Sequence, residues 1–268
     1  MDPLVSIVMP AYNAAAYIDE AVRSVLAQTY TNWELYIVND GSTDSTPAIL
    51  TTFTDPRIHV LHKANGGIGS ARNMAMDQLK GDFFCCLDAD DVLPQRSLEA
   101  RLKQFSAADH VSIVDGQVQF MDRSLRKLIR RYVPQRSEIP FHELVTFSGK
   151  CYMGLSWMMR WGPNETLRFH EGITHAEDLL FCLMYSKGRA MLTTDETVLL
   201  YRRSGNTSMT TNFEGMEHAF HTIGRTLKRD GYATLMERIT FTYKYRRIMS
   251  GTYWNAGKRW KALNAWIK

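Results

Sequence analysis

Residues 83–91 read Phe-Phe-Cys-Cys-Leu-Asp-Ala-Asp-Asp, so five apolar residues lead directly into three carboxylates among four positions. An apolar run of this length is typical of a strand buried on both faces of a parallel sheet. Carboxylates this close repel one another unless a cation or hydrogen-bond donors hold them. The stretch therefore predicts a buried strand that delivers Asp88, Asp90 and Asp91 to its carboxyl end, where open parallel sheets bind ligands.

The sequence before this stretch alternates short apolar runs with amphipathic segments. The expected strands are residues 4–9, 33–38, 57–61 and 83–87, and the expected helices are residues 17–28, 44–53, 70–80 and 94–105. Strand-helix-strand units of this kind imply right-handed crossovers. The fold class predicted is α/β, a Rossmann-like and mostly parallel sheet.

The pattern changes after residue 110. Val111 to Phe120 and Leu128 to Val133 flank a basic tip at 122–127 and predict a hairpin, which gives the sheet a mixed edge. The tip is either a solvated turn or an anion-binding segment. We further expect a helix at 176–187, a strand near 197–201 and two helices between Phe213 and the end. This divides the chain into a domain at 1–212, with a donor half at 1–110 and an acceptor half at 111–212, and a helical extension at 213–268.

Composition narrows the class of protein. The chain has 268 residues and a net charge of +4, too small for a dedicated nucleic-acid binder, so we expect no nucleic-acid partner. The four cysteines form no CxxC pair, which favours free thiols in a reducing compartment over a zinc or disulfide role. With no signal peptide and no apolar run of about 18 residues, we expect a cytoplasmic chain, either free or peripheral at the inner face of the cell membrane.

Two further strand ends carry polar residues. The first strand runs into Pro10-Ala11-Tyr12-Asn13 and the second into Asn39-Asp40-Gly41-Ser42. A planar base can stack on Tyr12 and bond to Asp40. Taken singly, Tyr12 also fits a core aromatic and Asp40 a turn-former, but at adjacent strand ends they favour a nucleotide pocket.

The third strand leads into a glycine-rich loop at 63–73, which enters a helix. Backbone amides and the helix dipole at such a loop suit an anion, although Gly66-Gly67 also fits a plain flexible turn. Arg72, one turn into the helix, and Lys63 on the other flank strengthen the ligand interpretation.

The carboxylates at 88–91 suit a hard divalent cation such as Mg²⁺ or Mn²⁺, which takes one or two carboxylates together with diphosphate oxygens. The alternative is an N-cap for the helix that follows Pro94, and we assign that role to Asp91 only.

Taken together, residues 6–13, 38–44, 67–73 and 87–91 resemble glycosyltransferase family 2, which has the GT-A fold. The resemblance extends from residue 4 to about 205. It implies an inverting, metal-dependent enzyme. Pro10, Tyr12, Asp40 and Arg72 match positions that hold the base and ribose, usually of uridine, with Asn13, Lys63 and Gly67 beside them. In the DxD motif Asp88-Ala89-Asp90, Asp88 matches the carboxylate near the ribose and Asp90 the metal ligand.

The same resemblance points to residues in the second half. Glu177-Asp178 is similar to the acidic pair of the family, with Asp178 as general base, although acids in a first helical turn also complement the helix dipole. Arg203 matches a loop that closes over the donor, and is otherwise an ordinary surface residue. Trp157 lies where the acceptor wall is expected, and is otherwise a core residue.

The last thirty-one residues, Arg238 to Lys268, contain eight Lys or Arg and no acid, interleaved with aromatic residues. This composition suits a segment that faces anionic lipid headgroups. A basic helix packed on the domain and an oligomer contact are the alternatives.

The sequence thus predicts transfer of a hexose or N-acetylhexosamine from a UDP-sugar to an oligosaccharide acceptor, in bacterial synthesis of capsule, O-antigen or wall glycan. The acceptor would be free or carried on a lipid, and the cofactor Mn²⁺ or Mg²⁺. The alternatives are a non-catalytic nucleotide-sugar or glycan binding protein and a peripheral membrane scaffold acting through its basic tail.

Overall fold

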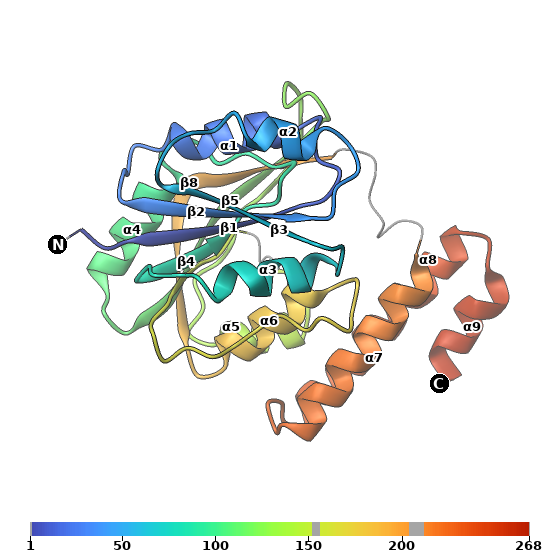
Figure 1. Cartoon of the computed structure of the whole chain (residues 1–268). Helices are drawn as coiled ribbons and strands as arrows, with labels where there is room; N and C mark the ends of the chain where they lie inside the picture. The colour runs from blue at the N-terminus through green and yellow to red at the C-terminus, as the bar shows by residue number, and fades with distance from the viewer. Residues whose placement is uncertain (1, 152–155, 204–211, 268) are drawn as a thin grey trace.

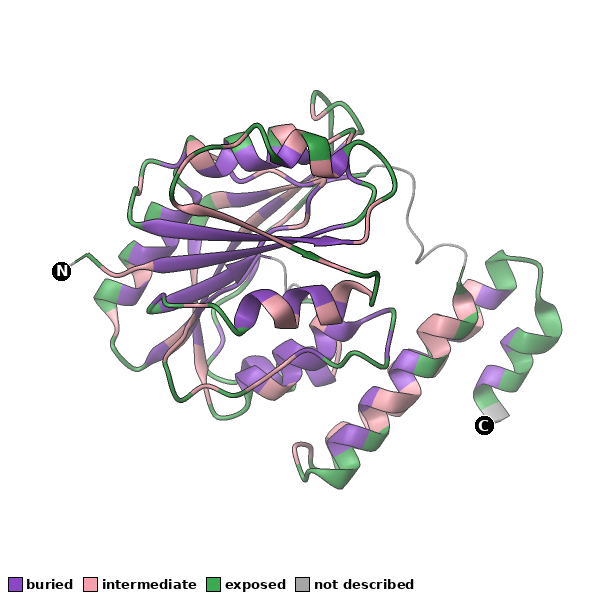
Figure 2. Cartoon of the chain, in the orientation of Figure 1, coloured by how far each residue is buried: buried purple, intermediate pink, exposed green. Residues whose placement is uncertain are grey.

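A central sheet organises the chain in the computed structural model, which describes residues 2–151, 156–203 and 212–267. The four strands of the first half pair in parallel, in the order β3-β2-β1-β4. They are β1 (Val5–Ala11), β2 (Trp33–Asp40), β3 (Ile58–Lys63) and β4 (Phe83–Cys86). Every residue of β1, β2 and β4 is buried, as their apolar runs predict (Figure 2).

Helices connect these strands and cover both faces of the sheet. They are α1 (Ile18–Leu26), α2 (Thr46–Leu50), α3 (Ile68–Met76) and α4 (Ser97–Ala107). Figure 1 shows α1 and α2 over one face and α3 over the other. All four helices overlap the predicted segments, so the predicted α/β class is confirmed.

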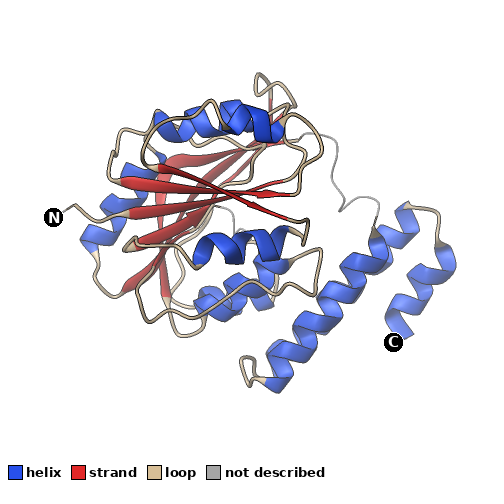
Figure 3. Cartoon of the chain, viewed as in Figure 1, coloured by secondary structure: helices blue, strands red, loops and turns tan. Residues whose placement is uncertain are grey.

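The second half adds the mixed edge (Figure 3). Its strands are β5 (Val111–Met121), β6 (Leu128–Tyr132), β7 (Met158–Arg160) and β8 (Ala190–Arg202), and its helices are α5 (Pro140–Val145) and α6 (Glu177–Ser186). β5 and β6 form the predicted antiparallel hairpin, β7 lies antiparallel between β4 and β5, and β8 runs parallel to β5. β7 and α5 were not predicted, because each covers too few residues to show a periodic pattern.

The C-terminal segment forms three helices where two were expected: α7 (Phe213–Arg229), α8 (Leu235–Asn255) and α9 (Arg259–Ile267). The expected count was wrong because Gly257, with φ +73, ends α8 and lets α9 fold back. α8 begins with a capping box of Thr234 and Glu237. Among the described residues, no helix is both long and apolar enough to cross a membrane.

α8 packs on the body of the protein through one stripe of side chains. Phe241, Tyr245, Met249 and Tyr253, spaced four residues apart, are all buried. Phe241 stacks on Phe147, with ring centroids 5.5 Å apart. The packed-helix alternative for the tail is therefore correct for this stripe.

Gly116 in β5 is required by the close approach of β8. A Cβ at this position would lie 2.3 Å from Cγ1 of Val198. We expect Gly116→Ala to lower the free energy of unfolding by about 1–3 kcal/mol in urea titrations, because overpacking a buried site forces neighbouring atoms apart. Gly251→Ala is the control: it lies within α8 with nothing inside 4 Å, and should leave stability unchanged or raise it by up to about 1 kcal/mol. Equal effects of the two substitutions would contradict the packing account.

Candidate active site

A cleft of about 500 Å³ opens at the carboxyl ends of β1, β2 and β4. Most of the residues predicted to bind the donor line it together: Pro10, Tyr12, Asn13, Asp40, Gly67, Asp88, Ala89 and Asp90. They come from four separate segments, which the parallel strands bring to one edge of the sheet.

Asp40 closes the glycine-rich loop. Its Oδ1 accepts from the amide of Gly66 at 2.9 Å and its Oδ2 from the amide of Gly67 at 2.8 Å. Gly67 has φ +88, a left-handed conformation that favours glycine. The loop conformation is thus held by a side chain from the neighbouring strand.

Lys63 does not line the cleft, although it was expected to flank the ligand. Its Nζ donates to Oδ1 of Asp40 at 2.7 Å and to the carbonyl of Ala64 at 2.8 Å. Both side chains of this ion pair are largely buried. Lys63 therefore supports Asp40 and the loop.

Tyr12 and Asn13 occupy the turn after β1. The Tyr12 side chain is exposed, so the core alternative is excluded. Asn13, at φ +49, accepts through Oδ1 from the amide of Thr43 at 2.8 Å, and its own amide donates to Oγ of Ser42 at 3.0 Å. Asn13 thereby ties the turn after β1 to the turn after β2, next to Tyr12, which lines the cleft.

Arg72 is buried, with an exposed fraction of 1%, so the contact expected between its guanidinium and the donor is not what the structure shows. One terminal nitrogen donates to Oδ1 of Asp88 at 2.9 Å and the other to Oε1 of Glu177 at 2.8 Å. Burial lowers the pKa of the guanidinium, but the charges of Asp88 and Glu177 outweigh it and the net shift is upward. Arg72 is a positioning residue that joins α3, the end of β4 and α6.

Asp91 was expected to be the N-cap of the next helix, but the structure shows that it is not. The N-cap of α4 is Arg96, which has no side-chain capping bond. Asp91 is buried and accepts through Oδ1 from the amide of Arg202 at 2.8 Å. Burial, reinforced by Asp88 and Asp90, raises the pKa of Asp91 well above its usual value.

Arg202 is a residue that sequence reasoning missed. Its side chain is 3% exposed and donates to the carbonyl of Asp90 at 2.6 Å and to Oε2 of Glu20 at 2.6 Å. Its guanidinium also lies over the ring of Tyr17, 4.9 Å from the centroid. Arg202 therefore fixes the backbone of the carboxylate segment against α1, but only its proximity to Arg203 in the sequence hinted at it.

Glu177 and Asp178 do not line the cleft. Glu177 binds Arg72, and the half-buried Asp178 borders a small cavity with Arg72, Cys86 and Phe181. Burial is the main cause that raises the pKa of Asp178 to about 7, and the charge of Glu177 adds to it. A carboxyl with this pKa can exchange a proton near neutrality.

The loop at 169–174 contributes to the lining of the cleft and was also missed. Glu171, Ile173 and Thr174 line the cleft. Asn73 of α3 holds the loop, since its Nδ2 donates to Oε1 of Glu171 at 2.8 Å and its Oδ1 accepts from the amide of Phe169 at 2.8 Å. No local sequence pattern predicts this contact, because its partners lie almost a hundred residues apart in the chain.

The expected acceptor contact of Trp157 and the expected donor contact of Arg203 have different outcomes. Trp157 is fully buried, so it cannot stack on a sugar and the core alternative is correct. Arg203 is exposed and its amide donates to the carbonyl of Met121, and its contact with a diphosphate stays a prediction. Residues 153–155, which precede Trp157, and residues 204–208, which follow Arg203, lie outside the described residues.

The carboxylates fit a divalent cation that is shared with a ligand. Within the described ranges, no group of three His, Cys, Asp or Glu residues is placed to hold an ion unaided. Asp88 and Asp90 both line the cleft, however, and Mg²⁺ or Mn²⁺ commonly takes one or two protein carboxylates plus substrate phosphates. The donor set thus suits an ion that arrives with a diphosphate. All four cysteines are free thiols.

Known proteins resemble this chain in sequence and in fold. The family model for glycosyl transferase family 2 matches residues 6–169. Chondroitin synthase of Pasteurella multocida is 46% identical over 105 residues, which are 38% of this chain and 11% of the synthase. The chain spans less than half the length of such curated relatives.

Two solved structures share the fold alone, at 17% and 18% identity. S. aureus TarS 1–349 in complex with UDP-GlcNAc has a TM-score of 0.66, covering 97% of this chain and 90% of that one. Mannosyltransferase PcManGT from Pyrobaculum calidifontis, in complex with GDP-Man and Mn²⁺, has a TM-score of 0.68, covering 99% and 74%. The predicted GT-A fold is thereby confirmed.

Removal of the Arg72 charge should leave two carboxylates without their shared cation. We expect Arg72→Met to lower the free energy of unfolding by about 3–5 kcal/mol near neutral pH, because breaking a buried ion pair strands a charge. Arg136→Met, in an exposed pair with Glu138, should change it by at most about 1 kcal/mol. Urea denaturation followed by circular dichroism measures both, and a loss at Arg72 no larger than at Arg136 would show that the bridge is unimportant.

Proposed function

Since the chain belongs to glycosyl transferase family 2, we propose that it transfers a hexose or N-acetylhexosamine from a UDP-sugar to a glycan acceptor, with inversion at the anomeric carbon. The observation that carries this proposal is the single cleft that collects Tyr12, Asp40, the glycine loop, Asp88 and Asp90. An exposed ring, backbone amides and paired carboxylates are the groups that a base, a diphosphate and its cation require.

In this proposal the uracil stacks on Tyr12 and the ribose lies near Asp88. Asp90, with Asp88 beside it, would hold the cation, which would stabilise the negative charge on the departing diphosphate. Arg72 and Arg202 keep the carboxylates in place through contacts made before the donor binds, so little reorganisation is needed at the moment of reaction.

The base is proposed to be Asp178. Asp178 does not line the cleft itself but borders the small cavity beside Arg72, so the proposal requires the acceptor hydroxyl to reach that cavity. The hydroxyl attacks the anomeric carbon, its proton passes to the carboxylate of Asp178, and the bond to the diphosphate oxygen breaks with its electron pair. The raised pKa supports this role, since a base works best when its pKa is near the working pH. Glu171, which lines the cleft, is the carboxylate against which this assignment must be tested.

For the acceptor we propose a growing polysaccharide. This rests on the likeness to chondroitin synthase over 105 residues. An intracellular location, a lipid carrier for the acceptor and the contact of Arg203 with the diphosphate stay predictions.

A panel of UDP-, GDP- and dTDP-sugars with Mn²⁺ tests the reaction class, with release of free nucleotide as the signal. We expect turnover with a UDP-sugar and a loss of at least about 100-fold in Asp90→Asn, because a carboxylate that holds the cation is removed. Calorimetric binding of a UDP-sugar without any turnover would support a non-catalytic binding protein instead. Turnover with GDP- or dTDP-sugars alone would refute the base assignment.

The pH profile tests the base. Because the pKa of Asp178 is raised, its ionised fraction grows as pH increases, so kcat/KM should rise with pH and level off above about 7. Asp178→Asn should lower kcat by about 10²–10⁴-fold and remove this limb. Glu171→Gln is the matched control and should keep the limb. The reverse pattern would make Glu171 the base.

A further inference from the structure

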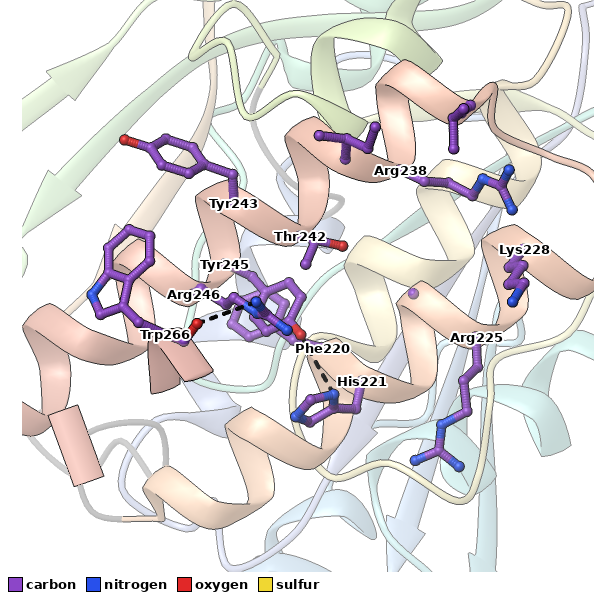
Figure 4. A pocket seen from close by; sticks show the side chains of 13 residues that line it. Phe220, His221, Arg225, Lys228, Arg238, Thr242, Tyr243, Tyr245, Arg246 and Trp266 are labelled. Carbon is purple, nitrogen blue, oxygen red and sulfur yellow. Dashed lines mark hydrogen bonds between the residues drawn. The ribbon is translucent and has the colours of Figure 1, made fainter. Parts of the chain in front are cut away.

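A second hollow, separate from the active site, lies among the three C-terminal helices. It is a groove of about 890 Å³ between α7, α8 and the end of α9 (Figure 4). Four cations line it: Arg225 and Lys228 from α7, and Arg238 and Arg246 from α8. No Asp or Glu is among the described residues that line the groove.

The cations of this groove are not neutralised by the protein. Within the described part of the chain, none of the four forms an ion pair with an acid. The Nε atoms of Arg238 and Arg246 are buried and have no hydrogen-bond partner. Four positive groups facing one hollow repel one another, so the free groove carries an electrostatic cost that an anion would remove.

Exposed apolar side chains border these cations. Leu235, Ile239 and Tyr243 follow one another at four-residue spacing on α8, and are 63%, 52% and 51% exposed. Trp266 of α9, 42% exposed, meets Tyr243 with ring centroids 5.6 Å apart. This stripe is distinct from the buried stripe of Phe241, Tyr245 and Met249, which packs against the protein.

We propose that this groove docks the chain on an anionic bilayer, with a lipid phosphate between the four cations and the stripe of Leu235, Ile239, Tyr243 and Trp266 at the acyl boundary. Cations beside exposed aliphatic and aromatic residues are the combination that interfacial helices use. A soluble polyanion would engage the cations but would leave Leu235 and Ile239 in water, so the apolar stripe favours the membrane.

The groove locates the basic surface more narrowly than the composition of residues 238–268 did. Two of the four cations, Arg225 and Lys228, lie outside that segment, on α7. Lys244 and Arg247, inside it, line a different hollow with Phe147 on another side of α8. The docking surface is therefore defined by the packing of three helices, and it does not depend on the proposed transferase reaction.

Sedimentation with vesicles of 70% phosphatidylcholine and 30% phosphatidylglycerol tests the proposal on the full chain. We expect binding that weakens with salt, and a loss of about 10- to 30-fold in Arg225→Ala/Lys228→Ala, since each cation near the surface contributes to attraction. Lys244→Ala/Arg247→Ala removes the same charge from α8 and should lose less than about 3-fold. Both substituted residues on α7 are exposed, so folding is not expected to suffer.

The apolar stripe is tested by Leu235→Ser/Ile239→Ser, which should also weaken vesicle binding by at least about 10-fold. Equal losses in the two charge variants would reduce the effect to net charge and overturn the proposal. If the unaltered chain does not bind vesicles, the proposal is overturned. It is also overturned if the chain binds soluble polyphosphate but not vesicles and the serine variant keeps the polyphosphate binding. Donor hydrolysis should be unchanged in all these variants, which separates this result from failure of the proposed function.

Discussion

The buried guanidinium of Arg72 is the interaction on which the active site depends. It lies between Asp88, which follows β4, and Glu177, which begins α6, and these partners are 16 and 105 residues away in the sequence. A guanidinium buried this deeply is stable only with charged acceptors in good geometry, which these two carboxylates supply. The bridge therefore ties α3 and the end of β4 to α6 and holds the side chain of Asp88 in position at the cleft.

Arg202 makes the complementary contact on the other side of the carboxylate segment. Arg72 holds the side chain of Asp88, whereas Arg202 holds the carbonyl of Asp90 and, through its own amide, the carboxyl of Asp91. Asp40 likewise holds the backbone of the glycine loop, by accepting from the amide of Gly67. Much of the charge near the cleft is thus used to orient backbone and neighbouring side chains, which is how a site keeps its geometry before a ligand arrives.

The C-terminal helices divide their surface in a similar way. One stripe of α8 packs on the body through Phe241 and Phe147, and another faces the basic groove. A single helix can do both because the two stripes are offset by two residues, which separates them by nearly half a turn. The basic composition of the tail alone could not distinguish these two uses.

The sequence by itself determined the parallel sheet and the set of residues at its carboxyl edge. Apolar runs in β1, β2 and β4 can be read locally, and their polar ends must meet because parallel strands share one edge. Only the tertiary structure decided what each side chain does there. It buried Arg72 and Trp157, turned Asp91 from a cap into a partner of β8, paired Lys63 with Asp40 and brought Arg202 and Glu171 to the site. Each of these outcomes depends on a partner from a distant segment, and the spacing of residues along a chain carries no information about which distant segment a side chain will meet.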